Sequence, residues 1–175
     1  AELNQLVNQR FLLATLGVTV YGVVTAWLLP KTGTFDAGNT VIVLAGTSLL
    51  LVLLLTLYLL GFFLKGVIRV LSTYLIATET SAWEKDFRRF RKDGWFGYTR
   101  AYAFLFLVLG LLGVGFPILL WVTAGLTPTD PFQRTLLLVM CVIAAVYFIL
   151  VIGIGFGDWW DPEKKAERRW QSLQS

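Results

Sequence analysis

The chain has 175 residues, of which 57% are hydrophobic and 15% are charged, and its formal net charge is +4. A soluble domain of this length cannot bury so much apolar surface, whereas a lipid bilayer accommodates it without an internal core. Histidine is absent and Cys141 is the single cysteine, which excludes imidazole-based metal, haem or proton-relay chemistry and an internal disulfide.

Four apolar stretches follow one another along the chain, at 11–29, 41–64, 101–126 and 135–157, and none contains Asp, Glu, Lys or Arg. Each is close to the ~20 residues that a helix needs to cross the hydrocarbon core. Backbone groups in lipid must satisfy one another, so we expect α-helices. The sequence predicts an all-α integral membrane protein with a single membrane domain over 1–175.

The ends of these stretches carry helix and membrane signals. Residues 1–10 are polar and lack the pattern of a secretory signal, so we expect 11–29 to remain as the first span. Asp130 followed by Pro131 is typical of an N-cap and first helical position, which places the start of the fourth helix there.

Small and hydroxyl-bearing residues recur at helical spacing within the spans. In lipid, such faces let helices approach closely, so we expect these residues to pack a four-helix bundle or to contact partner helices. The candidates are Thr15, Thr19, Gly22, Gly110, Gly113, Pro117, Ala144 and Ala145. A pore or substrate path lined by such faces is the alternative. Pro117 also predicts a kink, because it cannot donate to the carbonyl of Gly113.

The segment 65–93, between the second and third spans, is amphipathic and predicted to be helical. It either continues the second span as one helix, or bends near Gly66 or residues 72–73. A capping box at 81–84 favours a new helix starting at Ser81. Basic and aromatic side chains gather near its end, in the set Trp83, Phe87, Arg88, Arg89, Phe90, Arg91, Lys92 and Trp95.

This basic-aromatic set fits two kinds of contact. Cations beside a bilayer attract anionic lipid headgroups, at about 1 kcal/mol each. The same cations with large aromatic anchors suit docking to an acidic partner subunit. Nucleic acid is not expected as a partner, because acidic residues interrupt the run at 84, 86 and 93.

The basic residues also set the direction of the chain. All of the 15 basic residues except Lys31 and Arg134 lie before the first span, between the second and third, or after the fourth. By the positive-inside rule, both termini, the segment 65–100 and the tail 158–175 are expected in the cytoplasm, in a cytoplasmic or inner membrane. Trp27 and Trp121 fall at the outer ends of their spans, as interfacial aromatics do.

No span contains an ionisable Asp, Glu, Lys, Arg or His side chain, the usual mark of proton relays, coupled transporters and voltage sensors. We therefore expect no catalytic, cofactor or metal site. The leading hypothesis is a non-catalytic accessory subunit or assembly factor of a larger membrane complex, such as a bioenergetic one. The alternative is a small homo-oligomeric channel or transporter lined by Thr, Ser and Gly faces. A lipid-acting enzyme would have only interfacial carboxylates, such as Glu79 and Asp158, to work with.

Overall fold

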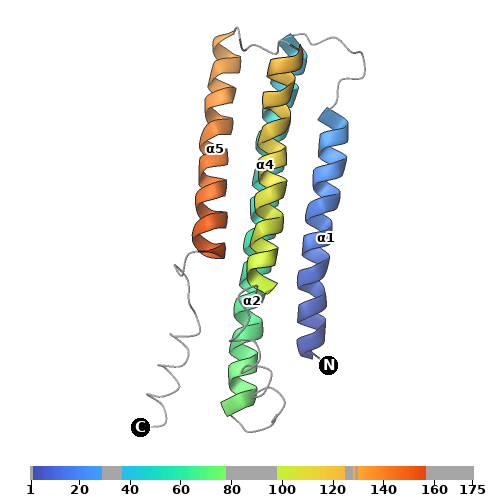
Figure 1. Cartoon of the computed structure of the whole chain (residues 1–175), viewed down its shortest axis with the longest axis vertical. Helices are drawn as coiled ribbons and strands as arrows, with labels where there is room; N and C mark the ends of the chain where they lie inside the picture. The colour runs from blue at the N-terminus through green and yellow to red at the C-terminus, as the bar shows by residue number, and fades with distance from the viewer. Residues whose placement is uncertain (1, 29–36, 78–97, 125–127, 129, 157–175) are drawn as a thin grey trace.

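The computed structural model describes residues 2–28, 37–77, 98–124, 128 and 130–156 (Figure 1). These residues form four α-helices: α1 (Glu2–Leu28), α2 (Ala37–Ala77), α4 (Tyr98–Ala124) and α5 (Pro131–Gly155). Each contains a segment long and apolar enough to cross a membrane, at Asn8–Leu28, Asn39–Ile68, Arg100–Thr123 and Pro131–Gly155. The predicted all-helical architecture, with four helices long and apolar enough to cross a membrane, is confirmed.

The helices pack side by side with alternating direction (Figure 1). α2 and α4 both contact all three other helices, whereas α1 and α5 do not contact each other. α2 and α4 therefore form the central pair, with α1 and α5 on either side of it. Because the chain reverses between successive spans, the start of α1, the end of α2, the start of α4 and the end of α5 share one end of the bundle, called here the terminal end.

The second helix is much longer than a bilayer requires. α2 has 41 residues, or roughly 60 Å at 1.5 Å per residue, against ~30 Å of hydrocarbon. It runs without a break past Gly66 and residues 72–73, so segment 65–93 begins as a continuation of the second span. Residues 78–97, with the capping box at Ser81 and the basic-aromatic set, lie outside the described residues, as does the tail 157–175.

The start of α5 has the predicted N-cap. Asp130 is extended, at φ −88° and ψ 144°. Pro131 is the first residue of the helix, where a backbone N–H has no partner within the helix, so proline costs no hydrogen bond there. Asp130 contributes its backbone carbonyl, which accepts from the Arg134 N–H at 3.1 Å, while its side chain makes no capping bond. The fourth helix thus begins before the apolar run at 135, and its first turn contains Gln133 and Arg134.

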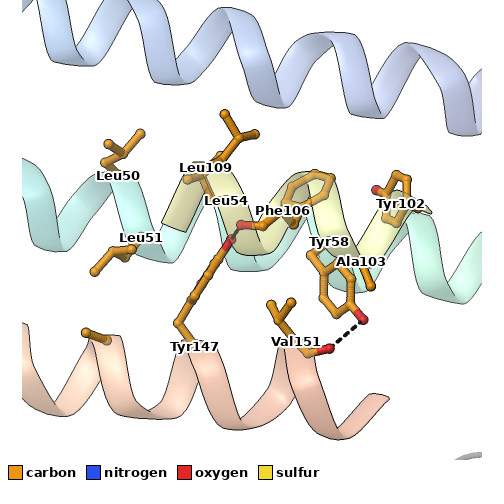
Figure 2. Packing of buried hydrophobic residues seen from close by; sticks show 11 residues of the cluster. Leu50, Leu51, Leu54, Tyr58, Tyr102, Ala103, Phe106, Leu109, Tyr147 and Val151 are labelled. Atoms are coloured by element: carbon orange, nitrogen blue, oxygen red, sulfur yellow. Dashed lines mark hydrogen bonds between the residues drawn. The ribbon is translucent and has the colours of Figure 1, made fainter. Parts of the chain in front are cut away.

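The buried core comes from three helices. α2 supplies Leu50, Leu51, Leu54 and Tyr58, α4 supplies Tyr102, Ala103, Phe106 and Leu109, and α5 supplies Ala144, Tyr147 and Val151 (Figure 2). α1 only packs against this cluster with partly buried side chains such as Ala14 and Val24. Large apolar side chains on the outside, among them Phe63 and Val122, are exposed as lipid-facing residues are.

α1 is held by two interlocking contacts, one at its C-terminal end and one near its middle. The Leu28 side chain fills the place that a Cβ at Gly46 of α2 would occupy. Nearer the terminal end, the Phe106 ring of α4 would lie 3.1 Å from a Cβ at Gly17. Glycine at both contacts lets α1 approach the central pair closely, as small residues do in membrane bundles.

Candidate functional site

Three buried tyrosines connect the core helices through hydroxyl-to-backbone hydrogen bonds. Tyr58 of α2 donates to the Val151 carbonyl of α5 at 3.3 Å, and Tyr147 of α5 donates to the Phe106 carbonyl of α4 (Figure 2). Tyr102 of α4 donates to the Leu57 carbonyl of α2 at 3.1 Å. The bonds form a closed circuit, α2 to α5 to α4 and back to α2, called here the three-tyrosine network.

Each acceptor carbonyl in this network has a glycine four residues later. Gly155 follows Val151, Gly110 follows Phe106, and Gly61 follows Leu57. In a helix, the side chain at i+4 leans back towards the N-terminus and over the carbonyl of residue i. Glycine leaves that carbonyl open to a donor from a neighbouring helix.

The close approaches show why a methyl group would not fit at these positions. A Cβ at Gly61 would collide with the Tyr102 hydroxyl, and a Cβ at Gly110 would collide with the Tyr147 ring. A Cβ at Gly155 would meet Ala103 and would lie 3.1 Å from the Tyr58 hydroxyl oxygen. Each tyrosine thus lies over a glycine and bonds to the carbonyl that the glycine uncovers.

Aromatic packing joins the tyrosines and extends the cluster to α1. The Tyr58 and Tyr102 rings stack with centroids 5.9 Å apart, and Phe106 packs against both. The guanidinium carbon of Arg10 lies 4.7 Å from the centroid of the Tyr102 ring, and Arg10 is almost fully buried. A guanidinium over an aromatic face is a cation–π contact, which ties the start of α1 to the network.

The chemistry of the network is that of helix packing. Each of these three tyrosine hydroxyls donates to an amide carbonyl, a group that does not take up the proton, so the three bonds do not form a proton relay. Among the described residues, no group of three or more His, Cys, Asp or Glu side chains comes together to hold a metal ion. The three hydrogen bonds fix the positions of α2, α4 and α5 along their axes relative to one another.

The packing candidates divide into two groups. Gly110 lies under Tyr147, Gly113 faces Leu50 and Leu51, and Pro117 and Ala144 are buried. Thr15, Thr19, Gly22 and Ala145 are exposed on the outside of the bundle instead. The Thr15 and Thr19 hydroxyls donate to carbonyls of their own helix, and nothing lies within 4 Å of a Cβ at Gly22.

Comparison with known proteins adds no relative to this geometry. No protein-family model, no curated protein and no solved structure matches the chain.

Sequence reasoning did not find the three-tyrosine network. Neither the three tyrosines nor Gly61 and Gly155 were among the packing candidates. A tyrosine on one span and a glycine on another carry a signal only once the helices are paired and their register is known. One chain of 175 residues does not supply that pairing.

Replacing each network tyrosine by phenylalanine removes one inter-helix hydrogen bond and leaves the ring in place. We expect Tyr58→Phe, Tyr102→Phe and Tyr147→Phe each to lower the free energy of unfolding by about 0.6 kcal/mol, with an upper bound near 2 kcal/mol. Reversible unfolding in mixed micelles measures this. Tyr21→Phe is the control, because the Tyr21 hydroxyl makes no hydrogen bond in the described part of the chain. Equal losses in all four variants would contradict the network.

A methyl group at Gly61 should displace the Tyr102 hydroxyl. We expect Gly61→Ala to destabilise the bundle by about 1–3 kcal/mol, the usual cost of overpacking. Gly66→Ala is the matched control on the same helix, since nothing lies within 4 Å of a Cβ there. Alanine should stabilise that position by about 0.5–1 kcal/mol. The same unfolding measurement decides, and a stabilising Gly61→Ala would rule out the close approach.

Proposed function

We propose that this chain is a non-catalytic accessory subunit or assembly factor of a larger membrane complex, for example a bioenergetic one. The observation that carries the proposal is the outer face of α1. α1 is the least buried of the four spans, and Thr15, Thr19 and Gly22 follow one another along its exposed side. Lipid requires no small residues, whereas a second helix packs closely against them.

The length of α2 supports a second docking element. The membrane-span segment of α2 ends at Ile68, and the helix continues to Ala77, about 14 Å further at 1.5 Å per residue. The basic-aromatic set, residues 83–95, follows this extension in the sequence. Its cations and aromatic side chains suit an acidic partner subunit and the anionic headgroups beside it. The partners we propose are other membrane subunits, or a second copy of this chain, within the bilayer.

The channel hypothesis receives less support from the geometry. The centre of the bundle is filled by Leu54, Phe106 and Tyr147, all almost completely buried. A path lined by Thr15, Thr19 and Gly22 would have to run between several copies of the chain. The Thr15 and Thr19 hydroxyls already donate to their own helix, so each offers such a path only an acceptor.

We propose a direction for the chain as well: both termini and the segment 65–97 in the cytoplasm. The distribution of basic residues supports this orientation, since only Lys31 and Arg134 lie on the other side. The alternating helices are compatible with it, because the start of α1 and the end of α5 share the terminal end.

Neutralising the basic run should release the chain from its complex. We expect native membranes, extracted in mild detergent, to yield a large assembly on blue-native gels that Arg88→Gln, Arg89→Gln, Arg91→Gln and Lys92→Gln together dissociate. The matched control removes four cations from the tail, at Lys164, Lys165, Arg168 and Arg169, and should keep the assembly. Migration of the wild type as a lone monomer would refute the proposal, and equal loss in both variants would refute the role of residues 88–92.

The orientation is tested with reporter fusions. A fluorescent protein fused after Ser175 should fluoresce, because it matures in the cytoplasm, and alkaline phosphatase fused there should be inactive. Phosphatase inserted after Gly33, in the first short loop, should be active. The reverse pattern would show that the chain lies the other way round.

A further inference from the structure

Thr47 of α2 is a buried hydroxyl that makes no hydrogen bond with the described part of the chain. Its exposed fraction is 0%, and its Oγ1 atom has no partner. Other hydroxyls on these helices donate to the carbonyl four residues earlier, namely those of Thr15, Thr19, Thr25, Ser48, Thr56, Thr123 and Thr135. Burial of an unsatisfied hydroxyl is unfavourable, so this exception calls for a partner.

The surroundings of Thr47 follow from the α2–α4 contact. Leu50 and Leu51, one turn later on α2, would lie 3.6 and 3.9 Å from a Cβ at Gly113 of α4. The two helices run in opposite directions. Thr47 therefore lies at the level of the helical turn that follows Gly113, the turn that ends at Pro117.

That turn of α4 contains a carbonyl that lacks its helical donor. Proline has no N–H, so the Gly113 carbonyl lacks the donor that residue 117 would otherwise supply. Gly113 and Pro117 are both buried and, at i and i+4, share one face, which Gly113 places towards α2. A hydroxyl donor without a partner and a carbonyl without its helical donor thus lie at one depth of the core.

A tyrosine fills the position of the missing side chain at Gly61 and Gly110, but at Gly113 a Cβ would make only ordinary contacts, so this face of α4 is less tightly covered by its neighbours. Buried waters typically make about three hydrogen bonds to polar groups that have no other partner.

We propose that an ordered water molecule binds between α2 and α4, accepting from the Thr47 hydroxyl and donating to the Gly113 carbonyl. Ordered waters commonly satisfy the carbonyls that proline frees in membrane helices. The water would hold the central pair of helices together on the loop side, while the three-tyrosine network holds it at the terminal end.

Removing the Thr47 hydroxyl tests this site. The Tm should fall if the hydroxyl holds a water, and it should stay unchanged or rise if the hydroxyl is buried without a partner. If Thr47 Oγ1 holds the water, Thr47→Val should lower the Tm by about 2–4 °C, the shift expected for one lost hydrogen bond in a chain of this length. Thr47→Ser should retain the wild-type Tm within about a degree. Thr56→Val, at an exposed threonine of the same helix, is the control and should change little. An unchanged or raised Tm for Thr47→Val would overturn the proposal.

A double-mutant cycle ties the hydroxyl to the carbonyl. Pro117→Ala returns an N–H donor to Gly113, so the water loses its main acceptor, and Thr47→Val in that background should cost less than half as much. Additive losses would show that Thr47 does not act through Gly113. A cryo-EM map of the wild type in nanodiscs, at a resolution that shows other buried waters, should contain density within 3.2 Å of both atoms. Density at neither atom, or a direct hydroxyl–carbonyl bond, would also overturn the site.

Discussion

A polar group inside a bilayer finds its hydrogen-bond partner in the protein or in a trapped water, because the lipid tails offer none. The core of this bundle is organised around that constraint. Tyr58, Tyr102 and Tyr147 would each cost free energy if they were buried without an acceptor, and helix carbonyls are the acceptors at hand. The glycines four residues after Leu57, Phe106 and Val151 make those carbonyls reachable. Close packing and hydrogen bonding therefore depend on the same positions.

The closed circuit explains why α2, α4 and α5 form the core while α1 does not belong to it. Each of the three helices both donates and accepts one bond, so sliding any one of them along its axis would break two bonds. α1 is attached differently. The Arg10 side chain lies on Tyr102, Gly17 faces Phe106, and Leu28 lies against Gly46. These contacts leave the opposite side of α1, with Thr15, Thr19 and Gly22, free to meet another helix.

The two ends of the bundle differ in their polar groups. At the terminal end, Arg10 lies over the Tyr102 ring, and the tyrosine hydroxyls donate to backbone carbonyls of neighbouring helices. Towards the loop end, Thr40 and Gln133 are buried at the starts of α2 and α5, and Thr47 lies between them and the core. Beyond the bundle, α2 continues to Ala77 and leads into the basic-aromatic set. The exposed face of α1 thus lies outside the interlocked core, where a partner can bind without disturbing the network.

The sequence by itself determined the number, type and approximate limits of the spans. Hydrophobic length in lipid is a local property, and Asp130 with Pro131 marks a helix start whatever the tertiary structure is. It also selected Gly110, Gly113 and Pro117 as helix-packing positions. Only the tertiary structure decided what those positions meet, because small residues occur both under a neighbour, as Gly110 does, and on the outside, as Gly22 does. Contacts between distant parts of the chain decide which face of each helix packs against its neighbours and in which register. A periodicity within one helix does not encode them.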